Sequence, residues 1–205
     1  MGVYARHVLP RLINLSMQNK VARLERARFL PRAFGRVLEM GIGSGLNIPF
    51  YRSDIQMLCG VDPSPELLRM ARRRAAAAHF PVELIERSGE SLPTEDQTFD
   101  TVVTTWALCT IPNPVAALKE MKRVLKPEGH LIFIEHGRSP DARVLAWQNR
   151  LNPLWNRLGG GCNLNRKIDD LIVEAGFRIT QMDTGYGKGP RLLAYLYKGL
   201  ARRPS

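Results

Sequence analysis

A glycine-rich turn is the feature of this chain whose residue types and spacing most clearly indicate chemistry. Gly41, Gly43 and Gly45 alternate directly after the mostly apolar run 37–40, and Asp62 closes the next apolar run. Glycine lets the backbone turn sharply and approach a bound molecule closely. An acid at the end of the second strand lies where the two hydroxyl groups of a ribose need an acceptor. The pattern favours a nucleotide-like ligand, and a strand–turn–helix connection that binds nothing is the alternative.

The spacing of the glycines distinguishes between nucleotide classes. A dinucleotide-binding loop has the form G-x-G-x-x-G, whereas this loop reads G-x-G-x-G and carries Glu39 two residues before its first glycine. In this form the loop resembles the first motif of class I S-adenosylmethionine-dependent methyltransferases, E-x-G-x-G-x-G. The resemblance implies that the loop backbone supports the methionine part of the cofactor and that Asp62 binds the ribose hydroxyls.

Two further stretches extend this resemblance over residues 36–135. Residues 89–93 read Gly-Glu-Ser-Leu-Pro and precede the apolar stretch 99–103, and residues 122–129 are similar to the R-x-L-K-P-G-G turn of that family. Ser88 departs from the pattern, because many relatives carry Asp there. The resemblance places the adenine near residues 88–90 and the methionine near residues 105–108. The cofactor-binding residues that it implies are Glu39, Gly41, Gly43, Gly45, Asn47, Asp62, Pro63, Ser88, Gly89, Glu90, Thr105, Trp106 and Leu108.

Length and composition fit one compact enzyme domain. The 205 residues suffice for a sizeable core and are few for two domains. Cys59, Cys109 and Cys162 are widely spaced, with no C-x-x-C pair and no metal-ligand cluster, so we expect no metal and a reduced, intracellular protein. No apolar run approaches the ~20 residues of a membrane span, and the start of the chain lacks the apolar stretch of a signal peptide.

Basic charge is concentrated at the two ends of the chain. Residues 1–36 carry eight Lys and Arg against one acid, and residues 186–205 carry five against none, while the whole chain has a formal net charge of +11. Basic ends are suited to an anionic membrane surface, and solvated ends without a partner are the alternative. Nucleic acid is not expected, because the central body is near neutral and residues 104–107 read Thr-Thr-Trp-Ala in place of an N-P-P-Y base-pocket motif. We therefore expect a cytoplasmic protein, peripheral at the inner membrane face if the basic ends bind lipid.

Strands alternate with helices along most of the chain. Strands are predicted at 37–40, 56–61, 82–85, 99–104, 130–135, 177–181 and 192–197, and helices at 10–24, 45–51, 66–78, 115–126 and 166–175. This alternation favours an α/β fold around a doubly wound, mostly parallel seven-stranded sheet. The last two strands suggest a final antiparallel hairpin, the arrangement of the Rossmann-like methyltransferases. Residues 35–205 form the expected methyltransferase domain, and residues 1–34 form a basic N-terminal helical extension.

The third quarter of the chain resembles one group within the methyltransferases. The residues that carry this likeness are Glu135-His136, Trp147, Trp155 and the run Gly161-Cys162-x-Leu164-x-Arg166. They are similar to the group that includes the human alkyl-thiol methyltransferases, in which F-x-E-H is followed by tryptophans and G-C-x-L-x-R. The human members begin with a hydrophobic membrane anchor, whereas this sequence begins with a basic amphipathic segment. The resemblance implies methyl transfer, with a small hydrophobic alkyl thiol as the leading acceptor.

His136 and Glu135 are the candidate catalytic residues. A thiol must lose its proton before it attacks a methyl group, and a thiol pKa of about 8.5 leaves only a few per cent ionised near neutral pH. His136 ends the fifth strand, where open α/β sheets bind ligands, so its ring is the candidate base; a histidine that only positions its loop is the alternative. Glu135 either orients His136 or faces solvent. Cys162 lines the acceptor pocket or is a small buried apolar residue.

Other acceptors and other roles remain open. A phosphatidylethanolamine N-methyltransferase has a similar length, similar motifs and a basic amphipathic N-terminal helix, and a quinone or another small molecule is a third acceptor. A cofactor-binding module without catalysis and an RNA-associated protein are the alternatives from other classes. Ile13, Met17, Val21 and Leu24 predict one apolar stripe among arginines, so the N-terminal segment is either a lid over the acceptor or a helix in a membrane interface. Trp147 and Trp155 either roof the acceptor pocket or pack in the core.

Overall fold

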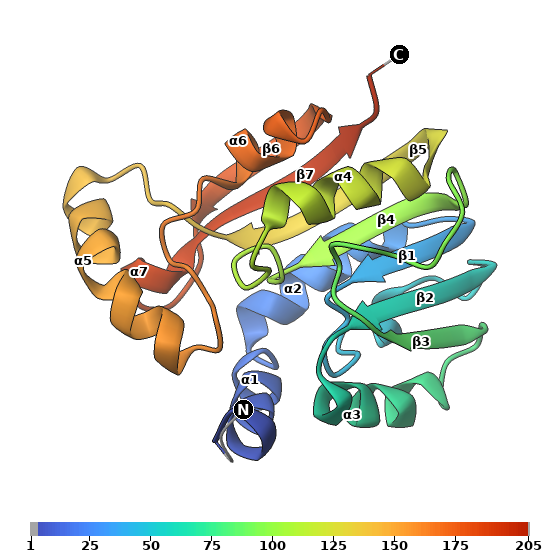
Figure 1. Cartoon of the computed structure of the whole chain (residues 1–205), viewed down its shortest axis with the longest axis horizontal. Helices are drawn as coiled ribbons and strands as arrows, with labels where there is room; N and C mark the ends of the chain where they lie inside the picture. The colour runs from blue at the N-terminus through green and yellow to red at the C-terminus, as the bar shows by residue number, and fades with distance from the viewer. Residues whose placement is uncertain (1–3, 205) are drawn as a thin grey trace.

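The computed structural model describes residues 4–204 as one seven-stranded sheet with helices on both faces (Figure 1). The strand order is β3-β2-β1-β4-β5-β7-β6, and β7 runs antiparallel between β5 and β6. The other neighbouring strands pair in parallel. The predicted doubly wound sheet with a final antiparallel hairpin is therefore confirmed. Of the predicted N-terminal segment 1–34, residues 1–3 lie outside the described residues.

The elements have the following bounds. The strands are β1 (Arg36–Met40), β2 (Met57–Asp62), β3 (Val82–Glu86), β4 (Phe99–Thr105), β5 (Leu125–His136), β6 (Arg178–Tyr186) and β7 (Tyr195–Arg202). The α-helices are α1 (Leu9–Ser16), α2 (Lys20–Phe29), α3 (Pro65–Ala75), α4 (Pro114–Val124), α5 (Ala142–Leu158), α6 (Ile168–Glu174) and α7 (Arg191–Ala194). A π-helical turn covers Tyr4–Val8, and 3-10 turns cover Leu30–Arg32 and Ile48–Phe50.

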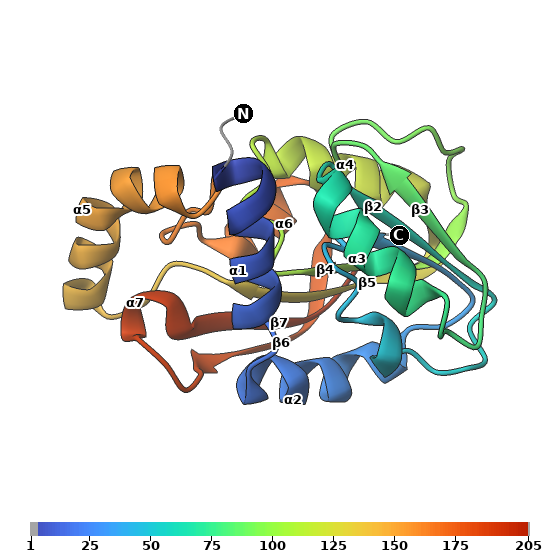
Figure 2. The same ribbon diagram turned by 90° about the horizontal axis from the view of Figure 1, so that it is seen from below.

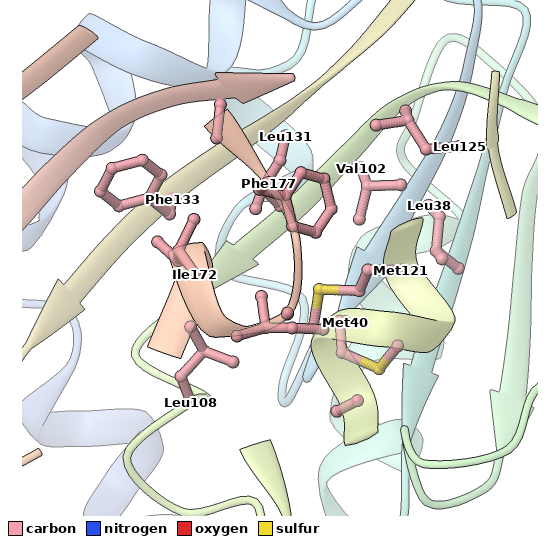
Figure 3. Packing of buried hydrophobic residues seen from close by; sticks show 14 of the residues in the cluster. Leu38, Met40, Val102, Leu108, Met121, Leu125, Leu131, Phe133, Ile172 and Phe177 are labelled. Atoms are coloured by element: carbon pink, nitrogen blue, oxygen red, sulfur yellow. The ribbon is translucent and has the colours of Figure 1, made fainter. Parts of the chain in front are cut away.

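The core has two halves, one on each face of the sheet. Successive residues of a strand point to opposite faces, so Val102 belongs to one half and Val103 to the other. Helices α4 and α6 cover the first face, where Met121 and Ile172 pack with Phe133 and Phe177 (Figure 3). Helices α2 and α3 cover the second face. Because central strands are buried on both sides, their sequences are almost continuously apolar.

Several helices begin where the sequence provides a cap. The Ser64 hydroxyl accepts a hydrogen bond from the Leu67 amide and the Asn113 side chain accepts one from Ala116, and proline follows each cap at the first helical position. Asp141 caps α5, which places a helix of 17 residues between β5 and α6. These caps determine where α3, α4 and α5 begin, near the carboxyl ends of the parallel strands.

The N-terminal region contains two helices, so the predicted single helix over 10–24 is wrong. The chain leaves α1 at Met17, and the Asn19 side chain accepts from the Ala22 amide and starts α2. The predicted apolar stripe is correspondingly interrupted, because Ile13 and Leu24 are exposed. Figure 2 shows α1 between α3 and the end of the molecule formed by α5. None of the helices between residues 4 and 204 has the length and apolar character needed to cross a bilayer.

Two further segments differ from the predicted elements. The last predicted strand, 192–197, begins too early: residues 191–194 form α7, and β7 continues to Arg202. The reason is long-range pairing, because β7 takes its register from β5 on one side and β6 on the other. The predicted helix over 45–51 is reduced to the 3-10 turn Ile48–Phe50.

Candidate active site

The three glycines of the loop after β1 have different structural roles. All three have positive φ angles, 72° at Gly41, 54° at Gly43 and 78° at Gly45. A Cβ atom on Gly41 would lie 2.4 Å from the Cβ of Ala107, and one on Gly45 would lie 2.9 Å from Ile48 Cδ1. At Gly43 the nearest atom would be 3.9 Å away. Gly41 and Gly45 therefore let the loop pack closely on the protein, whereas Gly43 borders open space in which a ligand can approach the backbone.

Asp62 lies beside this loop with its carboxylate buried. Oδ2 accepts a hydrogen bond of 3.0 Å from the Gly43 amide, and Oδ1 accepts one of 2.8 Å from the Ser64 amide. No Lys or Arg among residues 4–204 forms an ion pair with Asp62, and burial raises its pKa to about 6. Each oxygen keeps a lone pair free for a further donor. A pair of ribose hydroxyls supplies two such donors, so the loop and Asp62 fit the ribose of an adenosyl cofactor.

Glu39 and Asn47 form the centre of a buried hydrogen-bond network behind the loop. The Glu39 carboxylate accepts from Asn47 Nδ2 at 2.8 Å and from the Tyr51 hydroxyl at 2.7 Å. Asn47 Nδ2 also donates to Thr105 Oγ1 at 2.9 Å. Burial raises the Glu39 pKa to about 7. The network connects the end of β1 with the end of β4, and it brings together three residues that the sequence assigns to the cofactor.

Arg26 of α2 joins this network, and the sequence interpretation missed it. Its Nε donates to Asn47 Oδ1 at 2.7 Å, and one of its terminal nitrogens donates to the Met17 carbonyl at 2.7 Å. The guanidinium lies 5.0 Å from the centre of the Trp106 ring, a cation–π distance. Burial lowers the Arg26 pKa to about 10, and the nearby Glu39 carboxylate partly opposes this shift. The N-terminal helices thus contact the cofactor residues directly through one buried cation.

The residues assigned to the adenine lie at the end of β3. Ser88 donates to one oxygen of Glu90, and the other oxygen of Glu90 accepts from the Asn113 amide at 2.9 Å. Gly89 is buried, and a Cβ there would lie 2.3 Å from Met40 Sδ. Ser88 and Pro63 are exposed. Glu90 thereby ties the loop after β3 to the start of α4, at the edge of the sheet that also carries the glycine loop.

The segment after β4 separates the cofactor residues from the core. Trp106 has a φ of 51°, which is uncommon for a residue with a side chain, and its amide donates to the Ile134 carbonyl at 2.8 Å. Thr105 and Trp106 lie beside Asn47 and Arg26, as described above. The Leu108 side chain instead lies fully buried in the core beside Ile172 (Figure 3). Leu108 can therefore contact a cofactor only through its backbone.

The candidate catalytic residues lie at the end of β5, at the same edge of the sheet. His136 is buried, and its Nε2 lies 3.2 Å from Cys162 Sγ. Glu135 is fully buried and makes no hydrogen bond to His136 within residues 4–204; its Oε1 accepts from Thr104 Oγ1 and the Ala107 amide. Glu135 thus neither faces solvent nor orients His136 by a hydrogen bond, in contrast to the two roles predicted. Burial raises the Glu135 pKa to about 7.

Cys109 lies next to this pair, although the sequence predicts that the cysteines form no ligand cluster. The sulfur atoms of Cys109 and Cys162 and a ring nitrogen of His136 lie within 4.8 Å of one another. The expectation was wrong because the two cysteines are far apart in sequence and are brought together by separate loops. No short-range pattern in the sequence signals this contact, because it depends on where the loops after β4 and α5 meet.

The two tryptophans of α5 do not share one site. Trp147 is 54% exposed and stacks near Arg150, so it forms no roof over a buried pocket. It lines a shallow surface hollow of about 360 Å³ together with Arg143, Val144 and residues 190–192. Trp155 is partly buried, and its indole nitrogen is buried without a hydrogen-bond partner among the described residues.

Comparison with known proteins agrees with this arrangement. A methyltransferase domain family matches residues 38–133. Thiol S-methyltransferase TMT1B of Homo sapiens is 33% identical over 187 residues, which cover 88% of this chain and 76% of that protein. TMT1B of Rattus norvegicus is 36% identical over 151 residues, 72% of this chain and 62% of that protein. The chain therefore spans between about three fifths and three quarters of these relatives.

Two further matches bear on substrate and fold. Phosphatidylethanolamine N-methyltransferase of Cereibacter sphaeroides is 34% identical over 127 residues, 61% of this chain and 62% of that protein. The crystal structure of a S-adenosylmethionine-dependent methyltransferase from Thermotoga maritima superposes with a TM-score of 0.66 at 22% identity, covering 98% of this chain and 100% of that one.

The chain belongs to the S-adenosylmethionine-dependent methyltransferase family, and S-adenosylmethionine is its cofactor. Within this family it is similar to the thiol S-methyltransferases TMT1B. The residues present fit the cofactor, because Gly43 borders open space and the buried Asp62 carboxylate has no charged partner within residues 4–204. S-adenosylmethionine supplies an activated methyl group on a positively charged sulfur.

Proposed function

We propose that this methyltransferase transfers the methyl group to the sulfur of a small hydrophobic thiol. The observation that carries the proposal is the group of Cys109, His136 and Cys162, which lies at the carboxyl ends of β4 and β5 beside the cofactor residues. Ligands of open α/β sheets bind at this edge. The identity of 33–36% to proteins named thiol S-methyltransferase supports the same acceptor class.

Methyl transfer from a sulfonium needs an aligned nucleophile more than a strong acid or base. The attacking sulfur, the methyl carbon and the leaving sulfur must lie in line, so the main task of the protein is to position the acceptor. Trp106 and Glu135 support this positioning: Trp106 holds the end of β4 through the Ile134 carbonyl, and the Glu135 carboxylate holds the backbone at Ala107. The acceptor sulfur must also lose its proton. The sequence predicts that His136, at the end of β5, is the base that accepts this proton.

A product screen tests this proposal. The purified protein is incubated with S-adenosylmethionine labelled in its methyl group and, separately, with an alkyl thiol, phosphatidylethanolamine vesicles and a quinol. We expect label in the thioether product. The Asp62→Ala variant serves as a control that lacks the ribose acceptor, and its product formation must fall with the same acceptor.

Phosphatidylethanolamine is the competing acceptor, because one relative carries that name and the N-terminal helices are basic. Label that enters phospholipid while every thiol stays unlabelled would overturn the thiol proposal. Label in the quinol alone would assign the third acceptor class.

A further inference from the structure

Three metal-ligating side chains converge at the acceptor end of the sheet. Cys109 comes from the loop after β4, His136 ends β5, and Cys162 lies in the loop after α5. One ligand atom from each lies within 4.8 Å of the others, and His136 Nε2 lies 3.2 Å from Cys162 Sγ. Two thiols and an imidazole are the ligand types that zinc prefers.

The separations are close to those of a tetrahedral zinc site. Zinc–sulfur bonds of about 2.3 Å and zinc–nitrogen bonds of about 2.0 Å place neighbouring ligand atoms about 3.5–3.8 Å apart. The observed separations are 3.2 Å between His136 Nε2 and Cys162 Sγ and at most 4.8 Å between any two of the three ligand atoms, so they differ from these values by at most about 1.3 Å, which side-chain rotations can supply. Three protein ligands leave the fourth position open, which is typical of catalytic rather than structural zinc.

The loops that carry the two cysteines are fixed to each other. The Asn163 amide and its side-chain nitrogen both donate to the Cys109 carbonyl, at 2.8 and 3.0 Å. The Leu164 amide donates to Asn152 Oδ1 at 2.7 Å, which holds the Cys162 loop on α5. The Arg166 guanidinium donates to the Leu108 and Ile111 carbonyls on either side of Cys109. The ligands are therefore preorganised, which limits the entropy lost when an ion binds.

Charge and burial are also compatible with an ion. A zinc ion with two thiolates and a neutral imidazole carries no net charge, so its burial is far less costly than that of an isolated ion. The partial exposure of Cys162 leaves one side of the group accessible to a further ligand.

We propose that Cys109, His136 and Cys162 form a zinc site whose open fourth position binds the acceptor thiol; the second part rests on the proposed function. Zinc binding releases the protons of the two cysteine thiols to solvent, and the acceptor thiol also loses its proton when its sulfur coordinates the metal. The acceptor thiolate then forms a carbon–sulfur bond to the methyl group while the carbon–sulfur bond of the sulfonium breaks, which gives two neutral thioethers. In this arrangement His136 is a ligand, and the metal replaces it as the group that ionises the thiol.

Direct zinc titration tests the site. Reduced, metal-free protein of full length is titrated with zinc in competition with a chromophoric chelator, and one equivalent is expected to bind. Cys109→Ala and Cys162→Ala should each weaken zinc binding by more than ~100-fold, since even the loss of a group that supports a ligand costs 10–100-fold. Cys59→Ala is the matched control, because Cys59 is a buried cysteine of β2 outside the group, and it should bind zinc as tightly as the parent.

Cobalt substitution tests the same site in the unaltered chain. Bound Co²⁺ should show thiolate-to-metal charge-transfer absorption, and an added alkyl thiol should change the spectrum. Three results would each overturn the zinc site: absence of stoichiometric zinc binding, absence of this absorption, or a zinc affinity in both cysteine variants equal to that of the parent.

A rate measurement separates this inference from the proposed function. Zinc-loaded protein should methylate an alkyl thiol at least tenfold faster than metal-free protein. Full thiol methylation by metal-free protein would overturn the metal's part and leave the proposed function intact. Bound zinc without methylation of any thiol, together with label in another acceptor, would overturn the proposed function.

Discussion

Asp62 should dominate the affinity for the cofactor at the scale of single residues. Replacing Asp62 by alanine removes the acceptor for two hydroxyl donors, and a charge-assisted hydrogen bond contributes about 1.5–3 kcal/mol, so we expect S-adenosylhomocysteine to bind about 2–3 kcal/mol more weakly at pH 8. Calorimetry of both proteins measures this difference. Asp54→Ala is the control, because Asp54 is an exposed acid paired only with Arg52.

Comparing the cofactor affinities of the parent and Asp62→Ala at lower pH tests whether the ionised carboxylate causes the difference. Burial raises the pKa of Asp62 to about 6, so the carboxylate is mostly protonated at pH 5 and accepts less well. The affinity of the parent protein should therefore fall as the pH drops below 6, and the gap between parent and variant should narrow. A gap that stays constant from pH 8 to pH 5 would contradict the assignment of the ribose to Asp62.

Residues whose role depends on local spacing were the ones that the sequence could identify. Gly43 and Asp62 belong to this class. The turn after β1 determines the position of Gly43, and the end of β2 determines that of Asp62. Arg26 and Cys109 do not. Arg26 reaches Asn47 from another helix, and Cys109 meets Cys162 only because two loops cross the same edge of the sheet. No short-range pattern encodes either contact.

At the scale of elements, Arg26 should contribute far more than Arg28 to the stability with which α2 is held on the protein. Arg26→Ala leaves Asn47 Oδ1 and the Met17 carbonyl without donors in a buried region, so it should lower the free energy of unfolding by about 2–4 kcal/mol. Arg28→Ala on the same helix removes an exposed ion pair with Asp183 and should cost less than about 1 kcal/mol. Urea denaturation of the two variants measures both values; equal losses would mean that Arg26 does not anchor α2.

The exposed side of α1 allows a test of whether the N-terminal segment binds an anionic membrane surface. Leu12 is 51% exposed and Leu15 71% exposed on a segment with a formal charge of +7 in residues 1–36. Each basic residue near an anionic surface contributes about 1 kcal/mol, so we expect the protein to sediment with anionic but not neutral vesicles, reversibly with salt. Leu15→Ser should weaken binding, while Val173→Ser, on α6 and also exposed, should not. No sedimentation with anionic vesicles at low salt would leave the N-terminal helices only the role of a lid.

The alternation of strands and helices followed from the sequence, but the helical state of residues 191–194 and some element boundaries did not. Strand–helix alternation predicted the sheet because strands buried on both faces are continuously apolar. The N-terminal helix was divided by the Asn19 cap, a local signal that the apolar spacing of residues 13–24 obscured. The start of β7 depends on pairing with β5 and β6, which lie far away in sequence. Propensity alone carries no information about such pairing.

At the scale of the whole molecule, cofactor binding should stabilise the fold. A ligand at 100 times its dissociation constant stabilises the native state by about 2.7 kcal/mol. For a chain of this size that corresponds to a rise in Tm of about 5–10 °C with S-adenosylhomocysteine. NAD at the same concentration should give no shift, because the loop lacks the dinucleotide spacing. An equal shift with NAD would contradict the choice of cofactor.

The position of β7 inside the sheet has a consequence for synthesis on the ribosome. The last strand of the chain pairs with β5 on one side and β6 on the other, and its Lys198 forms an ion pair with Glu25 of α2. During synthesis β5 has an unpaired edge until β7 emerges, and α2 lacks its ionic partner until Lys198 emerges. Open strand edges promote association between chains. The nascent protein is therefore vulnerable to aggregation until residues 195–202 have emerged, and the pairing of β7 then closes the sheet and supplies the ionic partner of α2 in one event.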